Sequence, residues 1–210
     1  LHPEELRLLE RQHQPEDVLR AVRWARQAGF NNLNLDLMYG LPYQTLAAWE
    51  RTLNLAIKLR PEHFSLYALT LEHGALMQNW VNRGLLPEPD ADLAAEMYEY
   101  ASDRLVQAGY LQYEISNWAI RQADGQVLAC QHNLQYWRNL PYLGFGAGAH
   151  GYAGGWRTAN VLSPAAYIQR CLTGTVQSFP RTPATVEATP VDRDSEIAET
   201  MIMGLRLVQE

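Results

Sequence analysis

The spacing of apolar and polar residues near the start of the chain predicts a strand followed by a helix. In the segment 33–39, apolar residues alternate with polar ones, which is the period-two pattern of a β-strand. Gly40 and Pro42 end this strand, and Thr45 is suited to cap the helix that follows. Asp36 is the informative residue of the strand, because a carboxylate among apolar neighbours needs a hydrogen-bonding partner or a ligand.

The same order of helix and strand recurs along the first half of the chain. Apolar residues recur at helical spacing between Pro15 and Gly29, over 46–57 and over 94–108. Each of these helices is followed by a predicted strand, at 33–39, 64–71 and 111–118. Short joins between such units imply parallel strands with right-handed crossovers. The sequence therefore predicts an α/β fold, either an open sheet or a barrel, with ligands at the carboxyl ends of the strands.

The pattern changes after residue 118. An aromatic-rich segment at 132–137 precedes a glycine-rich run at 142–152, for which we expect a closely packed strand and turn. Prolines at 180, 183 and 190 indicate a linker, and helical spacing resumes from about Glu196. We predict an α/β domain over 1–177, a linker over 178–195, and the start of a truncated helical domain over 196–210.

Composition and charge exclude several classes of protein. The 210 residues carry a formal net charge of -6 and no cluster of Lys or Arg, which argues against a nucleic-acid binder. No apolar run approaches the roughly 20 residues needed to span a bilayer, and the first residues lack the apolar core of a signal peptide. Cys130 and Cys171 show neither a disulfide framework nor metal-ligand spacing, so a reducing cytoplasmic setting is expected. The chain starts without Met and within a helical pattern, so we expect a fragment of a longer protein.

Three charged or titratable residues besides Asp36 are candidates for chemistry. Arg11 could bind a carboxylate through two parallel hydrogen bonds, although a surface salt bridge is the better explanation of an arginine taken alone. Glu114 is either a base or a packing partner near a strand end. His132 is expected in a cluster with Trp118, Tyr136 and Trp137. It is either an axial ligand of a porphyrin iron or, as is commoner for a lone histidine, a core residue with a satisfied hydrogen bond.

Several motifs taken together resemble one family closely. They are Asn34-Leu35-Asp36-Leu37-Met38-Tyr39-Gly40-Leu41-Pro42, Ser65-Leu66-Tyr67-Ala68-Leu69-Thr70, Tyr113-Glu114-Ile115-Ser116-Asn117-Trp118, His132-Asn133-Leu134-Gln135-Tyr136-Trp137 and Gly144-Phe145-Gly146-Ala147-Gly148-Ala149-His150-Gly151. In this order and spacing they resemble the HemW-type haem chaperones, which are relatives of the oxygen-independent coproporphyrinogen III oxidases in the radical SAM superfamily.

The resemblance implies a fold, cofactors and site residues. It implies the C-terminal portion of a partial (β/α)6 barrel followed by a small C-terminal domain, with S-adenosylmethionine and a 4Fe-4S cluster bound in the intact protein. By position, Arg11 matches the arginine that binds the carboxylate of S-adenosylmethionine, Asp36 matches an aspartate that contacts the same molecule, and His132 matches the histidine implicated in haem binding. The three-cysteine cluster motif of the superfamily is absent, so the cluster ligands are expected outside this chain.

Three functions follow as alternatives. The first is a haem chaperone that binds haem and passes it to acceptor proteins, for which the resemblance suggests respiratory enzymes, a membrane-associated acceptor and a homodimer. The second is an oxygen-independent coproporphyrinogen III oxidase, which decarboxylates its substrate by radical chemistry. The third is an interaction module that binds neither haem nor S-adenosylmethionine. The histidine motif at 132–137 favours the chaperone over the enzyme.

Overall fold

The structure, a computed structural model, describes residues 2–72, 74–175 and 177–208. The elements in chain order are α1 (Pro3–Leu8), α2 (Pro15–Gln27), β1 (Asn34–Tyr39), α3 (Leu46–Lys58), β2 (His63–Ala68), α4 (Leu76–Asn82), α5 (Ala91–Gln107), β3 (Tyr110–Glu114), β4 (Asn117–Ile120), α6 (Gln131–Trp137), β5 (His150–Ala153), β6 (Trp156–Asn160), α7 (Pro164–Thr173), β7 (Thr185–Pro190) and α8 (Arg193–Gly204). The chain divides into two compact units, the first ending at Ala129 and the second beginning at Cys130.

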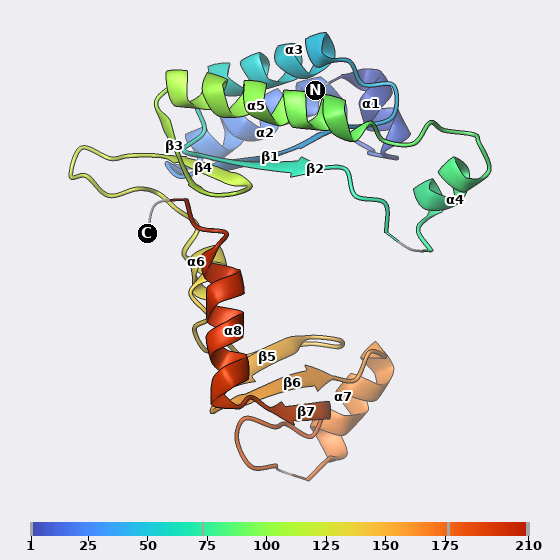
Figure 1. The fold of residues 1–210 in the computed structure, drawn as a ribbon, viewed down its shortest axis with the longest axis vertical. Helices are drawn as coiled ribbons and strands as arrows, with labels where there is room; N and C mark the ends of the chain where they lie inside the picture. Colours follow the sequence, from blue (N-terminus) through green and yellow to red (C-terminus); the bar gives the residue numbers. More distant parts are fainter. Residues whose placement is uncertain (1, 73, 176, 209–210) are drawn as a thin grey trace. The chain divides into compact units, whose positions relative to one another are not determined.

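The first unit is a four-stranded sheet with helices on one face. Its strand order is β1-β2-β4-β3, and β1 runs parallel to β2. Figure 1 shows α2, α3 and α5 on the same face of this sheet. Thr45 caps α3 as predicted, because its side-chain oxygen accepts a hydrogen bond from the backbone N–H of Ala48 at 3.2 Å. The predicted α/β fold is confirmed.

One predicted strand is two strands in the structure. The segment 111–118 was expected to form a single parallel strand, but β3 and β4 form an antiparallel hairpin instead. β4 then lies between β2 and β3 and runs antiparallel to both, so the expectation of purely parallel strands is wrong. The side chain of Glu114 holds the turn, because its Oε1 accepts hydrogen bonds from the backbone N–H of Ser116 at 2.8 Å and from the side-chain amide of Asn117.

The apolar core of the first unit lies between the sheet and helices α3 and α5. Its largest fully buried side chains include Trp49 and Leu53 of α3 and Phe64 of β2. The indole N–H of Trp49 donates to the backbone oxygen of Met97 in α5 at 2.8 Å, so the two helices are joined by a buried hydrogen bond as well as by packing. This core holds β1 and β2 in place, and these strands carry Asp36 and its neighbours.

The second unit is built on the antiparallel sheet β5-β6-β7, with helix α8 attached by polar contacts. Arg157 of β6 forms an ion pair with Glu199 of α8, and the hydroxyl of Tyr152 in β5 donates to Glu196 at 3.0 Å. The glycine-rich run is closely packed as expected: a Cβ on Gly144 would stand 2.1 Å from the backbone oxygen of His150.

The segment expected to be a linker contains regular structure. Within 178–195, β7 pairs with β6 along its length, and α8 begins at Arg193. The division into domains at 177 and 196 stays a prediction. Among the described residues, no helix has both the length and the apolar character needed to cross a bilayer.

Candidate functional site

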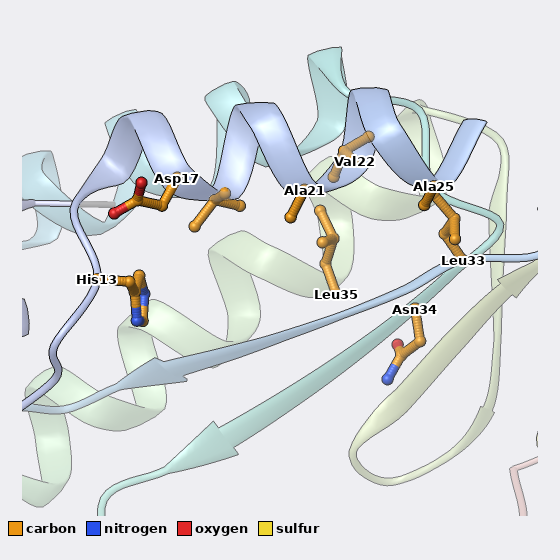
Figure 2. A pocket seen from close by; sticks show the side chains of 9 residues that line it. His13, Asp17, Ala21, Val22, Ala25, Leu33, Asn34 and Leu35 are labelled. Atoms are coloured by element: carbon orange, nitrogen blue, oxygen red, sulfur yellow. The ribbon is translucent and has the colours of Figure 1, made fainter. Parts of the chain in front are cut away.

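Polar side chains share the face of the sheet that lies opposite the helices. Leu35 of β1 points toward α2, whereas Asn34 points to the other side of the strand, as Figure 2 shows. Because β1 and β2 are parallel and in register, Asn34 lies beside His63, and Asp36 lies beside Ser65. The period-two pattern therefore separates an apolar face, which forms the core, from a polar face available for chemistry.

Arg11 and Asp36, predicted from far apart in the sequence, line one cavity. Its volume is about 520 Å³, within the range of roughly 300–1,000 Å³ found for small-molecule sites. The loop between α1 and α2 contributes Arg11 and His13, strand β1 contributes Asp36, and β2 contributes Tyr67. The cavity thus combines a guanidinium, a carboxylate and apolar side chains, which suits a ligand with both charged and apolar parts.

The backbone places Arg11 through a tight turn after α1. Glu10 has a φ of 53°, in the left-handed region that glycine adopts more readily, and this turns the chain out of the helix. The N–H of Arg11 then donates to the backbone oxygen of Leu6 at 2.8 Å. The Arg11 side chain is exposed, so its guanidinium is available for a carboxylate ligand.

Asp36 has both a partner and access to the cavity. Its Oδ1 accepts a hydrogen bond from the side-chain amide of Asn34 at 2.7 Å. In the part of the chain that the structure describes, no protein donor contacts Oδ2. One oxygen of the carboxylate is therefore engaged by the protein, and the other can accept from a ligand hydroxyl or amine.

Sequence reasoning missed His63, which lies behind Asn34 on the same face. Its ring nitrogens lie 2.7 Å from Asn34 Oδ1 and 2.7 Å from the hydroxyl of Tyr113, and the residue is 5% exposed. Burial lowers the pKa of His63 to about 4, and the nearby carboxylate of Asp36 acts in the opposite direction. The signal available in the sequence was the alternation of His63 and Ser65 with the apolar Phe64 and Leu66, which places both polar residues on one face of β2.

A second hollow lies between α2 and the outer edge of β1. It has a volume of about 430 Å³ and is lined by small and branched apolar side chains of α2 that face Leu33 and Leu35 (Figure 2). His13 and Asp17 stand at one end of this hollow. β1 is an edge strand of its sheet, so this hollow follows an unpaired strand edge.

His132 lies in the second unit, on the short helix α6. Its imidazole is exposed and packs edge-on against Tyr136, with ring centroids 4.9 Å apart and Nε2 3.2 Å from the Tyr136 hydroxyl. Tyr142 extends the ring contacts of Tyr136, with a centroid distance of 4.6 Å. The exposed imidazole can be reached by a ligand, which would compete with the tyrosine hydroxyl for Nε2.

Trp118 and Glu114, two further residues that the sequence singles out, are both fully buried in the first unit. Trp118, expected beside His132, is fully buried in the first unit and packs edge-on against Tyr98 at 5.9 Å. Glu114 is fully buried and holds the β3–β4 turn, which matches the packing alternative. Among the described residues, no group of three His, Cys, Asp or Glu side chains is arranged to hold a metal ion.

Comparison with known proteins gives relatives over most of the chain. No family model matches. The protein named "Heme chaperone HemW" of Bacillus subtilis (strain 168) is 40% identical over 196 residues, which is 93% of this chain and 48% of that protein. The protein of the same name from Mycobacterium tuberculosis (strain ATCC 25618 / H37Rv) is 40% identical over 80% of this chain and 42% of its own length. The chain is a relative of the HemW-type haem chaperones.

Other relatives agree with this assignment. The "Radical S-adenosyl methionine domain-containing protein 1, mitochondrial" of Mus musculus is 44% identical over 70% of this chain and 32% of its own length. The structure titled "Coproporphyrinogen III oxidase (HemN) from Escherichia coli is a Radical SAM enzyme" superimposes with a TM-score of 0.75 over 98% of this chain and 47% of that one. At 22% identity this likeness concerns the fold alone. The HemW-type chain spans about half the length of the curated relatives it matches.

Proposed function

We propose that this chain is part of a haem chaperone that binds haem and transfers it to acceptor proteins. The observation that supports this most directly is the exposed His132 imidazole, in a chain 40% identical to a protein named as a haem chaperone. A neutral imidazole nitrogen is a common axial ligand of haem iron. In this proposal His132 binds the iron of the transported haem, and Tyr136 releases Nε2 when haem arrives.

We further propose that the cavity beside β1 binds S-adenosylmethionine. The donor set fits this molecule, because Arg11 offers a guanidinium for its carboxylate and Asp36 offers an acceptor for a hydroxyl or amine. Apolar side chains of the same cavity, including those of Leu37 and Ala56, suit the uncharged parts of the ligand. S-adenosylmethionine, when bound beside a 4Fe-4S cluster, supplies a cleavable sulfonium. The described residues include no group of three His, Cys, Asp or Glu side chains arranged to hold a metal ion.

The remaining parts of the proposal concern the intact protein. In it, the sheet of the first unit forms part of a (β/α)6 barrel, the cluster ligands lie outside these 210 residues, and the protein works in the cytoplasm. Its acceptors include respiratory enzymes at a membrane, and it acts as a homodimer. The structural neighbour is named as an oxidase, but a likeness in fold gives no support for that activity in this chain.

Haemin titration of the intact protein tests the chaperone proposal. We expect a Soret shift that saturates at one equivalent in the wild type, disappears in His132→Ala, and remains in His150→Ala, which removes another exposed histidine of the same unit. The replacement of a single iron ligand accounts for the difference.

Each other outcome has a definite meaning. A shift that survives in His132→Ala removes this residue from the iron. No shift in the wild type overturns the chaperone proposal, and formation of protoporphyrinogen from coproporphyrinogen III in an anaerobic assay would replace it with the oxidase.

A further inference from the structure

A continuous chain of hydrogen bonds crosses the polar face of the sheet from β3 to β1. The hydroxyl of Tyr113 lies 2.7 Å from Nε2 of His63, and Nδ1 of His63 lies 2.7 Å from Oδ1 of Asn34. The amide nitrogen of Asn34 lies 2.7 Å from Oδ1 of Asp36. His63 and Tyr113 are 5% and 8% exposed, whereas Asp36 is exposed at the cavity. The chain therefore leads from buried groups to the carboxylate that meets a ligand.

The direction of every hydrogen bond in this chain follows from its last member. An ionised carboxylate only accepts hydrogen bonds, so Asn34 must present its NH2 group to Asp36 and its oxygen to His63. His63 must then carry its proton on Nδ1 and accept from the hydroxyl of Tyr113 at Nε2. A lowered His63 pKa, caused by burial, agrees with a neutral ring that uses one nitrogen as donor and the other as acceptor.

The amide of Asn34 needs this support to keep its orientation. Ser65 also lies within reach, with its Oγ 3.0 Å from the amide nitrogen and 3.3 Å from the amide oxygen of Asn34. A hydroxyl can donate or accept, so Ser65 tolerates either orientation of the amide. A reversed amide would point its oxygen at the Asp36 carboxylate, and it would also require His63 to move its proton to Nε2 and Tyr113 to accept there. A proton on Nδ1 of His63 therefore supports only the orientation in which Asn34 donates to Asp36.

We propose that His63 is a positioning residue for the ligand site. Through Asn34 it holds the Asp36 carboxylate with Oδ1 engaged and Oδ2 directed to the hydroxyl or amine of a ligand in the cavity. This inference rests on the proposed binding of S-adenosylmethionine, and it adds a residue that does not itself touch the ligand. Preorganised acceptors bind more tightly than mobile ones because less rotational freedom is lost on binding.

Two conservative variants separate positioning from mere structural support. In His63→Asn the amide nitrogen can occupy the place of Nδ1 and still donate to Asn34, whereas in His63→Gln the amide reaches the place of Nε2 and loses the contact with Asn34. Both variants are isolated anaerobically as the intact protein, and S-adenosylmethionine affinity is measured by calorimetry. We expect His63→Asn to bind within about threefold of wild type and His63→Gln to bind at least about tenfold more weakly.

The combination with a change at Asn34 tests whether the two residues act in one chain. Asn34→Leu should weaken the binding of S-adenosylmethionine as much as His63→Gln does. The double variant that combines Asn34→Leu with His63→Gln should bind S-adenosylmethionine no more weakly than Asn34→Leu alone. Melting temperatures without ligand report folding separately. Equal losses of affinity in His63→Asn and His63→Gln, or additive losses in the double variant, would overturn the inference.

A second readout keeps this inference distinct from the proposed function. Nitrogen-15 NMR of the histidine ring identifies the protonated nitrogen without any ligand, and we expect Nδ1 of His63 to carry the proton. If the wild type binds no S-adenosylmethionine, the proposed function fails at this site. If the proton is instead on Nε2, the positioning inference fails whether or not S-adenosylmethionine binds.

Discussion

At the scale of single residues, Asp36 was expected to have a partner or a ligand, and the structure gives it a partner for one of its two carboxylate oxygens. A carboxylate in a strand was expected to have either a partner or a ligand. Asn34 donates a hydrogen bond to Oδ1, whereas Oδ2 has no protein donor among the described residues. The partner lies two residues away on the same face of the strand, where the period-two pattern places it.

The buried histidine gives a pH dependence of folding. The pKa of His63 is about 4 in the folded chain and about 6.5 when unfolded, so the unfolded state binds more protons between these values. We therefore expect the free energy of unfolding to fall as the pH drops from about 6.5 to about 4, by on the order of 3 kcal/mol from this residue. Urea denaturation at several pH values measures this loss.

The variant His63→Asn is the control for that measurement, because it replaces the titrating ring and leaves Asp36, the nearby titratable carboxylate, in place. The hydroxyl of Tyr113 also faces the ring; it donates to Nε2 of the neutral ring and has to accept from Nε2 once the ring is protonated. The difference between wild type and variant should shrink as the pH falls. Parallel curves for the two proteins would contradict the lowered pKa of His63.

At the scale of elements, periodicity located the helices better than it located the strand ends. The helix predicted from Leu46 is observed as α3, with its predicted cap, because the apolar stripe and the capping residue both act within a few positions. The segment 111–118 reads as one strand, since β3 and β4 are each half-apolar and the turn between them lacks Gly and Pro. The buried carboxylate of Glu114 replaces the usual turn residues.

Two leucines of α3 provide a matched test of the core. Leu53 is 0% exposed and packs between the sheet and α5, whereas Leu55 on the outer side of the same helix is 48% exposed. We expect Leu53→Ala to lower the free energy of unfolding by about 2–5 kcal/mol and Leu55→Ala by less than about 1 kcal/mol. Chemical denaturation of both variants checks this, and similar losses would contradict the arrangement of α3 on the sheet.

At the scale of the whole molecule, the chain forms two compact units with a boundary between Ala129 and Cys130. The residues proposed for S-adenosylmethionine lie in the first unit, and His132 lies in the second. Each unit has its own sheet, so we expect a substitution that disturbs one sheet to speed hydrogen exchange within that sheet.

Gly144 allows this expectation to be tested in the second unit. A Cβ at this position would stand 2.1 Å from the backbone oxygen of His150, so we expect Gly144→Ala to destabilise the second unit by about 1–3 kcal/mol or more. Gly204 is the control, because a Cβ there meets no atom within 4 Å. Hydrogen exchange followed by mass spectrometry should show faster exchange in β5 and β6 for Gly144→Ala only. Unchanged exchange in β5 and β6 of Gly144→Ala would contradict the close packing of this glycine against His150.

The sequence by itself determined the α/β class, the course of β1 and α3, and the residue types available for a site. These follow from local spacing, capping and turn residues, which act over a few positions of the chain. Only the tertiary structure decided that β4 lies between β2 and β3 and that His63 reaches Asp36 through Asn34. The family resemblance implied one site for Arg11 and Asp36, local spacing did not, and the structure shows that both line one cavity. The physical reason is that strand pairing and side-chain contacts join residues far apart in the chain, and local periodicity carries no information about which distant strands become neighbours.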